Sequence, residues 1–177
     1  MTPISATPGS LFDRVRLLAG GVEVEDISYH SRWAHQEELL LGSTQRIDNL
    51  AEGWGGSVAA DAVTFTAEPI AAGAERRVMC SFGLAAFRQP KRWYMAATSL
   101  VLELELHPDN SYCFLDAGAQ WTITRPVILA SVIQADPAVS NGISSFLNSG
   151  KQLTILCPSS TYNIKAAITN SNSFMLP

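Results

Sequence analysis

The stretch from Arg14 to Ile27, RVRLLAGGVEVEDI, constrains the fold more than any other part of this sequence. Its centre, Gly20-Gly21, suits a two-residue turn in which both central residues take a positive φ. Apolar and polar residues alternate on both sides of the turn, which is typical of strands with one face in water. The pattern therefore predicts a β-hairpin, and with it a protein built on antiparallel strands.

A regular two-residue loop also predicts which residues lie opposite each other. Ala19 faces Val22, Leu17 faces Val24, and Val15 faces Asp26. On the other face Arg16 meets Glu25, a cross-strand charge pair worth a few tenths of a kcal/mol.

A second strand is predicted in LVLELELHPDN, which begins at Leu100. Four leucines at every second position point one way, while Val101, Glu103, Glu105 and His107 point the other way. Strict alternation over eight residues predicts a strand with one wet face. The Pro-Asp-Asn triplet that follows is turn chemistry.

Weaker patterns fill the middle of the chain. The second half of SYHSRWAHQEELLLG favours a helix that Gly42 can end, and STQRIDNLAEGWGG allows a short helical turn. SVAADAVTFTAEP predicts a strand with Val63 and Phe65 on one face. AERRVMCSFGLAAF fits a strand or a short helix, and PKRWYMAATS predicts a loop.

The last third contains one continuous apolar run, Val127–Ile133, preceded by Pro126. Such a run predicts a strand covered on both sides. Asp136-Pro137 then opens a short helix, whose apolar stripe is Ile143, Phe146 and Leu147 and which Gly150 ends. KQLTILCP predicts a further strand, and alternation from Ile164 to Ile168 allows one more.

The sum is about seven or eight short strands with two helical insertions. We therefore expect a mainly β chain, an antiparallel jelly-roll β-sandwich with one or two short helical insertions. Residues 1–10 form an irregular N-terminal arm, 11–157 the jelly-roll-like β-sandwich, and 158–177 a C-terminal strand or tail, or the link to a second jelly roll. The arm and the tail suit straps between subunits.

Composition narrows the function. Charged residues make up 16% of the 177 residues, below the usual quarter, and the net charge is −4. The chain therefore lacks the basic footprint of direct nucleic-acid binding. It also has no run of about 20 apolar residues that would span a membrane, and its N-terminus does not resemble a signal peptide. Three widely spaced cysteines predict buried thiols in a reducing compartment.

Two constellations deserve a chemical test. Glu103, Glu105 and His107 share a strand face, which can be read as a metal site of a cupin-like enzyme or as a solvated strand face. We favour the solvated face, because cupins present a His-x-His pair that is absent here. His30 and His35 are five residues apart and fall on different helix faces, so they are poor co-ligands.

The loop RQPKRWY combines basic and aromatic side chains: Arg88, Lys91, Arg92, Trp93 and Tyr94. Such a loop can stack on bases or bind phosphates, but in an acidic chain we favour a structural or protein-interface loop. The cysteines are read as small buried hydrophobic residues, with a catalytic cysteine beside His35 or His107 left as the alternative. We predict no catalytic residue, no bound metal and no cofactor.

Three stretches resemble the major capsid proteins of polinton-like viruses and virophages, and more distantly those of large nucleocytoplasmic DNA viruses, a double jelly-roll lineage. They are SLFDRVRLLAGGVEVEDISYHSRW, RWYMAATSLVLELELHPD and WTITRPVILASVIQADPAVSNGISSFLNSGKQLTI. They occur in the family's order and cover most of residues 10–155. The segment from Gly53 to Pro90 has no counterpart and is expected as a surface loop.

The resemblance implies a structural capsid protein, not an enzyme, that self-assembles through jelly-roll edges and loops into an icosahedral shell. Its partners would be copies of itself, as a trimeric capsomer, and other capsid proteins, and its location the virion, assembled inside the host cell. The family carries two jelly rolls in tandem, and 177 residues hold one. The chain is therefore expected as part of a longer capsid protein, a shortened paralogue or a minor capsid relative.

Overall fold

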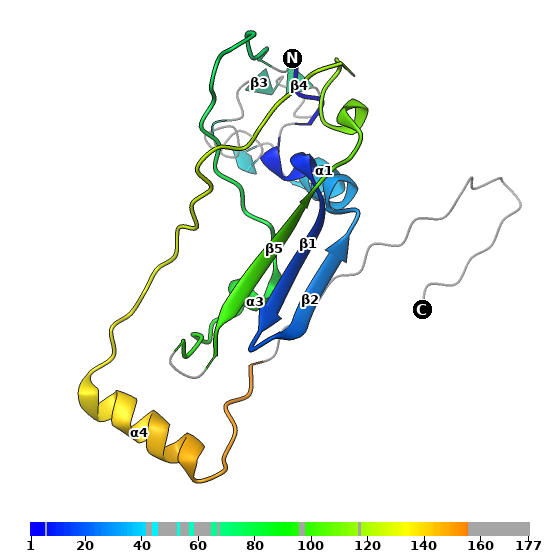
Figure 1. Cartoon of the computed structure of the whole chain (residues 1–177). Coiled ribbons are helices and arrows are strands. Elements are labelled where there is room, and N and C mark those ends of the chain that lie inside the picture. Colours follow the sequence, from blue (N-terminus) through cyan, green and yellow to red (C-terminus); the bar gives the residue numbers. More distant parts are fainter. Residues whose placement is uncertain are drawn as a thin grey trace, which may run out of the picture.

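The computed structural model describes residues 1–5, 7–41, 44–45, 53, 57–58, 65–66, 68–95, 98–116 and 118–155. Its elements, drawn in Figure 1, are η1 (Pro8–Leu11), β1 (Phe12–Ala19), β2 (Val22–Ser28), α1 (His30–Leu40), β3 (Ser57–Val58), β4 (Phe65–Thr66), α3 (Ala85–Arg88), β5 (Leu100–Leu106), η2 (Asn110–Tyr112) and α4 (Pro137–Asn148).

A three-stranded antiparallel sheet is the centre of the fold, with the strand order β2-β1-β5. A separate pair of short strands, β3 and β4, forms a second small sheet. Helix α1 and η1 lie at the end of the large sheet where β5 finishes (Figure 1). The predicted antiparallel β structure is thus present, in a chain of modest strand content with a few helices.

The predicted hairpin is confirmed at its turn. Gly20 and Gly21 have φ values of 58° and 82°, a conformation that glycine adopts at no steric cost. Ala19 lies opposite Val22, as expected. The predicted strand from Leu100 is also confirmed, because β5 pairs with β1 along its whole length.

Beyond the turn the predicted register is wrong by one residue. A β-bulge between Leu17 and Leu18 leaves Leu17 opposite Glu25 and Val15 opposite Ile27. One extra residue on a bulged strand moves every later side chain to the other face. As a result Ile27, which is 1% exposed, joins Val15 in the core where a regular hairpin would have placed an aspartate.

The expected Arg16–Glu25 pair is therefore also wrong. On the polar face of the sheet Arg14 Nε donates to Asp26 Oδ1 at 2.8 Å, and Arg16 pairs with Glu103 of β5. Opposite charges thus meet across both strand pairings on this face, and each pair contributes some tenths of a kcal/mol.

The core lies on the other face, under α3 and the segment before it. Its buried members are Leu11, Phe12, Val15, Leu17, Ile27, Leu84, Ala86, Cys113, Phe114 and Ala119. The side of β5 is less well covered, since Leu104 and Leu106 are 39% and 44% exposed. The core is thus closed over β1 and β2 and open over β5.

The N-terminal residues, expected as an irregular arm, pack into the core of their own chain. Pro3 and Pro8 are fully buried, and Pro3 forms a β-bridge with Phe114. The N-terminal amine donates to Ile70 O at 2.9 Å. These ties fix the described part of the arm to its own chain.

Helix α1 confirms the helix predicted in the second half of SYHSRWAHQEELLLG, and it begins earlier, at His30. In the predicted strand-or-helix segment only α3 is regular, so the helical alternative holds for its last residues. The described residues 90–95 and 98–99 form the predicted loop. Gly42, Val63, most of the predicted helical turn at 43–56, and the alternation near Ile164 lie outside the described residues.

The helix predicted after Asp136 is confirmed as α4. Asp136 Oδ1 accepts a hydrogen bond from Ala138 N at 2.8 Å, and Gly150, at φ 79°, closes the C-terminus by donating to Leu147 O. None of the helix residues is buried, however. The expected apolar stripe therefore has no core to pack on, and residues 151–155 do not form the predicted strand.

The strand predicted at Val127–Ile133 is also absent. This segment is extended but unpaired, and it runs along the outside of the fold towards α4 (Figure 1). Val127, Ile128, Leu129, Val132 and Ile133 are 68–87% exposed, so the segment is covered on neither side. Residues 127–133 thus have the apolar pattern of a buried strand but are not buried.

Candidate functional site

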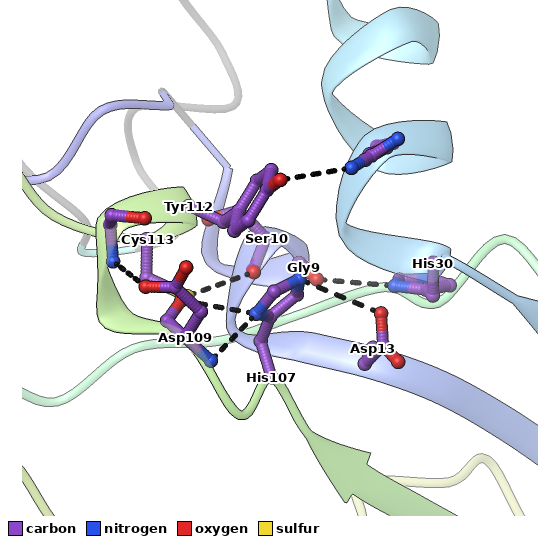
Figure 2. A network of polar contacts seen from close by, with 10 residues as sticks. Gly9, Ser10, Asp13, His30, His107, Asp109, Tyr112 and Cys113 are labelled. Carbon is purple, nitrogen blue, oxygen red and sulfur yellow. Dashed lines mark hydrogen bonds and ion pairs between the residues drawn. The ribbon is translucent and has the colours of Figure 1, made fainter. Parts of the chain in front are cut away.

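The densest polar cluster of the described residues lies where β5 ends beside the start of β1, and Figure 2 shows it. His107 follows β5, its side chain is 8% exposed, and its Nε2 lies 3.6 Å from Asp13 Oδ1. Its Nδ1 lies 3.1 Å from the amide nitrogen of Asp109 and 3.0 Å from the carbonyl oxygen of the same residue, so it accepts from the first or donates to the second according to its tautomer.

Aromatic and cationic groups cover this imidazole. The Tyr112 ring lies on His107 with centroids 4.6 Å apart. Arg32 of α1 is placed 5.0 Å above the Tyr112 ring and donates to its hydroxyl at 3.1 Å. The stack links α1, η2 and the end of β5, so its evident effect is to hold three elements together.

Cys113 lies beside this stack in the core. Its thiol donates to Ser10 O at 3.3 Å. Burial raises the pKa of this thiol to about 11, and the carboxylates of Asp109 and Asp13 act in the same direction. Because the thiolate is the nucleophilic form of cysteine, such a thiol is poorly suited to attack a substrate. The geometry thus favours the structural reading of Cys113, whereas Cys80 is only half-buried and Cys157 lies outside the described residues.

Asp109 is engaged in shaping the turn. Its carboxylate accepts from Ser111 N at 2.8 Å and so caps η2. Hydrogen bonding from the side chain of Ser111, and then from its backbone amide, holds the pKa of Asp109 below its usual value. The turn predicted at Pro-Asp-Asn is confirmed, with the aspartate as its organising residue.

His30 is fully buried between two parts of the backbone. Its Nδ1 lies 3.1 Å from Gly9 O and its Nε2 3.3 Å from Phe82 O. A neutral imidazole has one N–H and can donate to one of the two carbonyls at a time. Burial lowers the pKa of His30, because desolvation disfavours the charged ring.

His35 has separate partners. Its Nδ1 lies 3.3 Å from Ser5 Oγ and 3.6 Å from the carboxylate of Glu38. As their spacing predicted, His30 and His35 do not meet at a common point in the structure.

The three residues of the cupin-like alternative are also held apart. Glu103 pairs with Arg16, Glu105 lies opposite Arg14 on the polar face, and His107 turns to Asp13 beyond the strand. In the described ranges, no group of three or more His, Cys, Asp or Glu side chains is arranged to hold a metal ion.

The basic and aromatic loop makes contacts within the chain. Arg88 lies 3.5 Å from Glu37, Lys91 Nζ donates to Thr154 O at 2.8 Å, and Trp93 Nε1 donates to Ala86 O at 3.1 Å. Tyr94 shares a hydrogen bond of 3.3 Å with Ser144 of α4. These partners agree with a structural loop, which ties α4 and the residues after it to the sheet.

Two open grooves border the sheet. One, of about 520 Å³, is lined by Leu106, His107, Asn110, Gln120, Trp121 and Thr122. The other, of about 430 Å³, is lined by Ala19, Val24, Trp93, Thr98, Leu153 and Ile155. The first groove is lined mainly by polar side chains and the second mainly by apolar ones, and neither lining brings a nucleophile and a base together.

The most unusual surface feature is the exposed extended segment. We call residues 122–135 the strap. Within the described chain no backbone hydrogen bond joins it to another element, and from Pro126 to Ala135 it contains no charged residue. Contiguous apolar surface of this kind marks an interaction site in a soluble protein.

Comparisons of the chain with protein-family models, with curated proteins and with solved structures found no match. Among the helices of the described residues, none has the length and apolar character that a membrane crossing requires.

Proposed function

We propose that this chain is a structural capsid protein of a DNA virus, which self-assembles into an icosahedral shell. The observation that carries the proposal is the strap, with five large aliphatic residues 68–87% exposed in a run of seven. A chain that leaves so much apolar surface uncovered is suited to binding other protein subunits.

The ionisable groups support a structural role. The carboxylates of Glu25, Asp26, Glu103 and Asp109 each hold two parts of the chain together. The imidazoles of His30 and His107 do the same. Ionisable side chains that are engaged in such contacts make the fold rigid, and a subunit of a closed lattice needs a rigid fold.

The resemblance to double jelly-roll capsid proteins supports the same proposal. Its first stretch spans β1, β2 and part of α1, its second ends in β5, and its third contains the strap and α4. In this proposal the three-stranded sheet is one part of a jelly-roll sandwich whose remaining cover comes from further chain. The partners are copies of itself, as a trimeric capsomer, and other capsid proteins, and the location is the virion.

Electron microscopy tests the proposal. The full chain, purified and concentrated, should give ring-shaped capsomers or closed particles at micromolar concentration. A monodisperse monomer under these conditions would overturn the proposal. So would one equivalent of tightly bound iron, manganese or zinc in elemental analysis of the purified protein, since this would favour a metalloenzyme.

A further inference from the structure

The strap and the open side of β5 are complementary. The strap offers an extended, charge-free backbone from Pro126 to Ala135, with no backbone partner among the described residues. Strand β5 ends the sheet order, so its outer edge presents unpaired N–H and C=O groups in the part of the chain that the structure describes. An extended segment and a free edge of this kind join by strand addition.

The side chains indicate β5 as the recipient, and not β2 at the other edge. On the core face of β2, Glu25 and Ile27 are 3% and 1% exposed, because α3 and its flanking residues cover them. On β5, Leu104 and Leu106 face the same side of the sheet and remain 39% and 44% exposed. Apolar surface that still lacks cover thus lies at β5.

We propose that the strap of one copy adds as an antiparallel strand to the outer edge of β5 in a neighbouring copy of this chain. Val127, Leu129 and Ile133 then continue the apolar face of Leu104 and Leu106. Each copy gives one strap and receives one, so a ring of copies closes without a free β5 edge. The inference rests on the proposed shell function, because it names the contact by which copies join.

The donor is placed in a different copy because the strap stays off its own sheet although both of its ends are tied. Before it, Trp121 Nε1 donates to Asn110 Oδ1 at 2.9 Å. After it, Tyr94 holds Ser144 of α4. Between these ties the strap runs outside β5 (Figure 1) without a hydrogen bond to it.

The area is that of a weak contact that a ring of copies repeats. Three aliphatic side chains on the apolar face that bury roughly 100 Å² each remove about 300 Å² from water on the donor, and the recipient contributes a similar area. The total of about 600 Å² per contact is small, and closure of the ring adds the contacts together. Strap Gln134 and Thr124 lie outside the apolar run and contribute little to it.

A photo-crosslinking experiment identifies the donor copy. The full chain carries p-benzoylphenylalanine in place of Leu129, and equal amounts of ¹⁴N- and ¹⁵N-labelled protein are mixed before irradiation. We expect crosslinks from the strap to peptides containing β5, about half of them with mixed isotopes. The same crosslinker in place of Val22, at the far edge of the sheet, should not capture β5. Strap–β5 crosslinks that are all of one isotope would overturn the inference, since the strap would then close on its own chain.

Paired variants test the energetics by size-exclusion chromatography with light scattering. V127D/L129D places two charges on the face that packs on Leu104 and Leu106 and should raise the dissociation constant of the oligomer about a hundredfold or more, whereas T124D/Q134D adds the same charge outside the apolar run and should change it less than threefold. Since all four side chains are exposed in the single chain, thermal unfolding of each variant should match that of the wild type.

The outcomes separate the two proposals. Particles that form equally well with V127D/L129D would overturn the strap contact and leave the shell function standing. Strap-linked rings that never close into a shell would overturn the shell function and support the strap contact. A wild-type chain that stays monomeric would overturn both.

Discussion

Replacing Glu25 with alanine should destabilise the fold by about 3 kcal/mol, far more than a charged residue on a strand usually does. Glu25 is 3% exposed, and its carboxylate accepts from Ala85 N at 3.1 Å and Ala86 N at 3.3 Å. A hydrogen bond to a charged group contributes about 1.5–3 kcal/mol, and its loss leaves the donor without a partner. Glu25 makes two such bonds at the start of α3. Because the bond from Ala85 is partly open to water, we take the lower end of their summed contributions.

Urea unfolding followed by tryptophan fluorescence measures this cost. With a slope of about 2 kcal/mol per molar urea, a loss of 3 kcal/mol lowers the midpoint by about 1.5 M. Glu25→Gln keeps one acceptor oxygen and should lose about half as much. Glu23→Ala is the matched control, because that side chain is half exposed and lies 3.9 Å from Arg16, so its loss should cost less than about 0.5 kcal/mol.

Urea midpoints of the Glu25→Ala and Glu23→Ala variants that both stay close to that of the wild type would refute the reasoning. They would mean that the carboxylate of Glu25 does not cap α3 in solution, and that the bulge does not serve to bring it inside. A large loss in both variants would instead indicate that net charge on β2, and not burial, controls stability.

Three further predictions concern single residues. Gly83→Ala should cost about 2–3 kcal/mol in the same assay, because Gly83 has φ 64° and a Cβ there would strike the ring of Trp33; Gly73→Ala, at φ 74° in open space, should cost about 1 kcal/mol. Burial lowers the pKa of His30, so below about pH 6.5 the unfolded chain binds more protons than the folded one and the free energy of unfolding should fall; His30→Gln should reduce that slope between pH 7.5 and 5.5. The thiol of Cys113, with its pKa raised to about 11, should resist alkylation at pH 8 in the folded chain and react fully in urea, as peptide mass spectrometry would show; equal rates in both states would contradict its burial.

Local chemistry made the hairpin turn, β5 and α4 predictable. Paired glycines, strict alternation and an Asp-Pro helix start each act within a few residues, so the sequence alone is enough to recognise them. The bulge was missed although it has a signal. Apolar residues stand at Val22 and Val24 and next at Ile27, so the alternation changes parity, which is what an extra residue in one strand requires.

The N-terminal arm and the polar cluster could not be predicted because they depend on contacts distant in sequence. Pro3 and Pro8 carry no periodicity, yet both are fully buried: Pro3 bridges to Phe114, and Gly9, next to Pro8, contacts His30. His107 was read as a member of a strand face with Glu103, but the strand ends at Leu106 and the next residue turns to Asp13. One residue beyond a strand end is enough to change the partners of a side chain.

The strap has the residue types of a buried strand but is exposed in the single chain. Residue types determine the environment that a segment needs, and a run such as Val127–Ile133 is stable when both faces are dry. They do not determine which chain supplies that environment, because hydrophobic burial has no direction and does not distinguish one molecule from another. The predicted covered strand and the observed exposed strap are then compatible if the cover is intermolecular. On this view the wrong prediction at Val127–Ile133 is the strongest pointer to assembly in the chain, and the isotope-mixing experiment is the measurement that decides it.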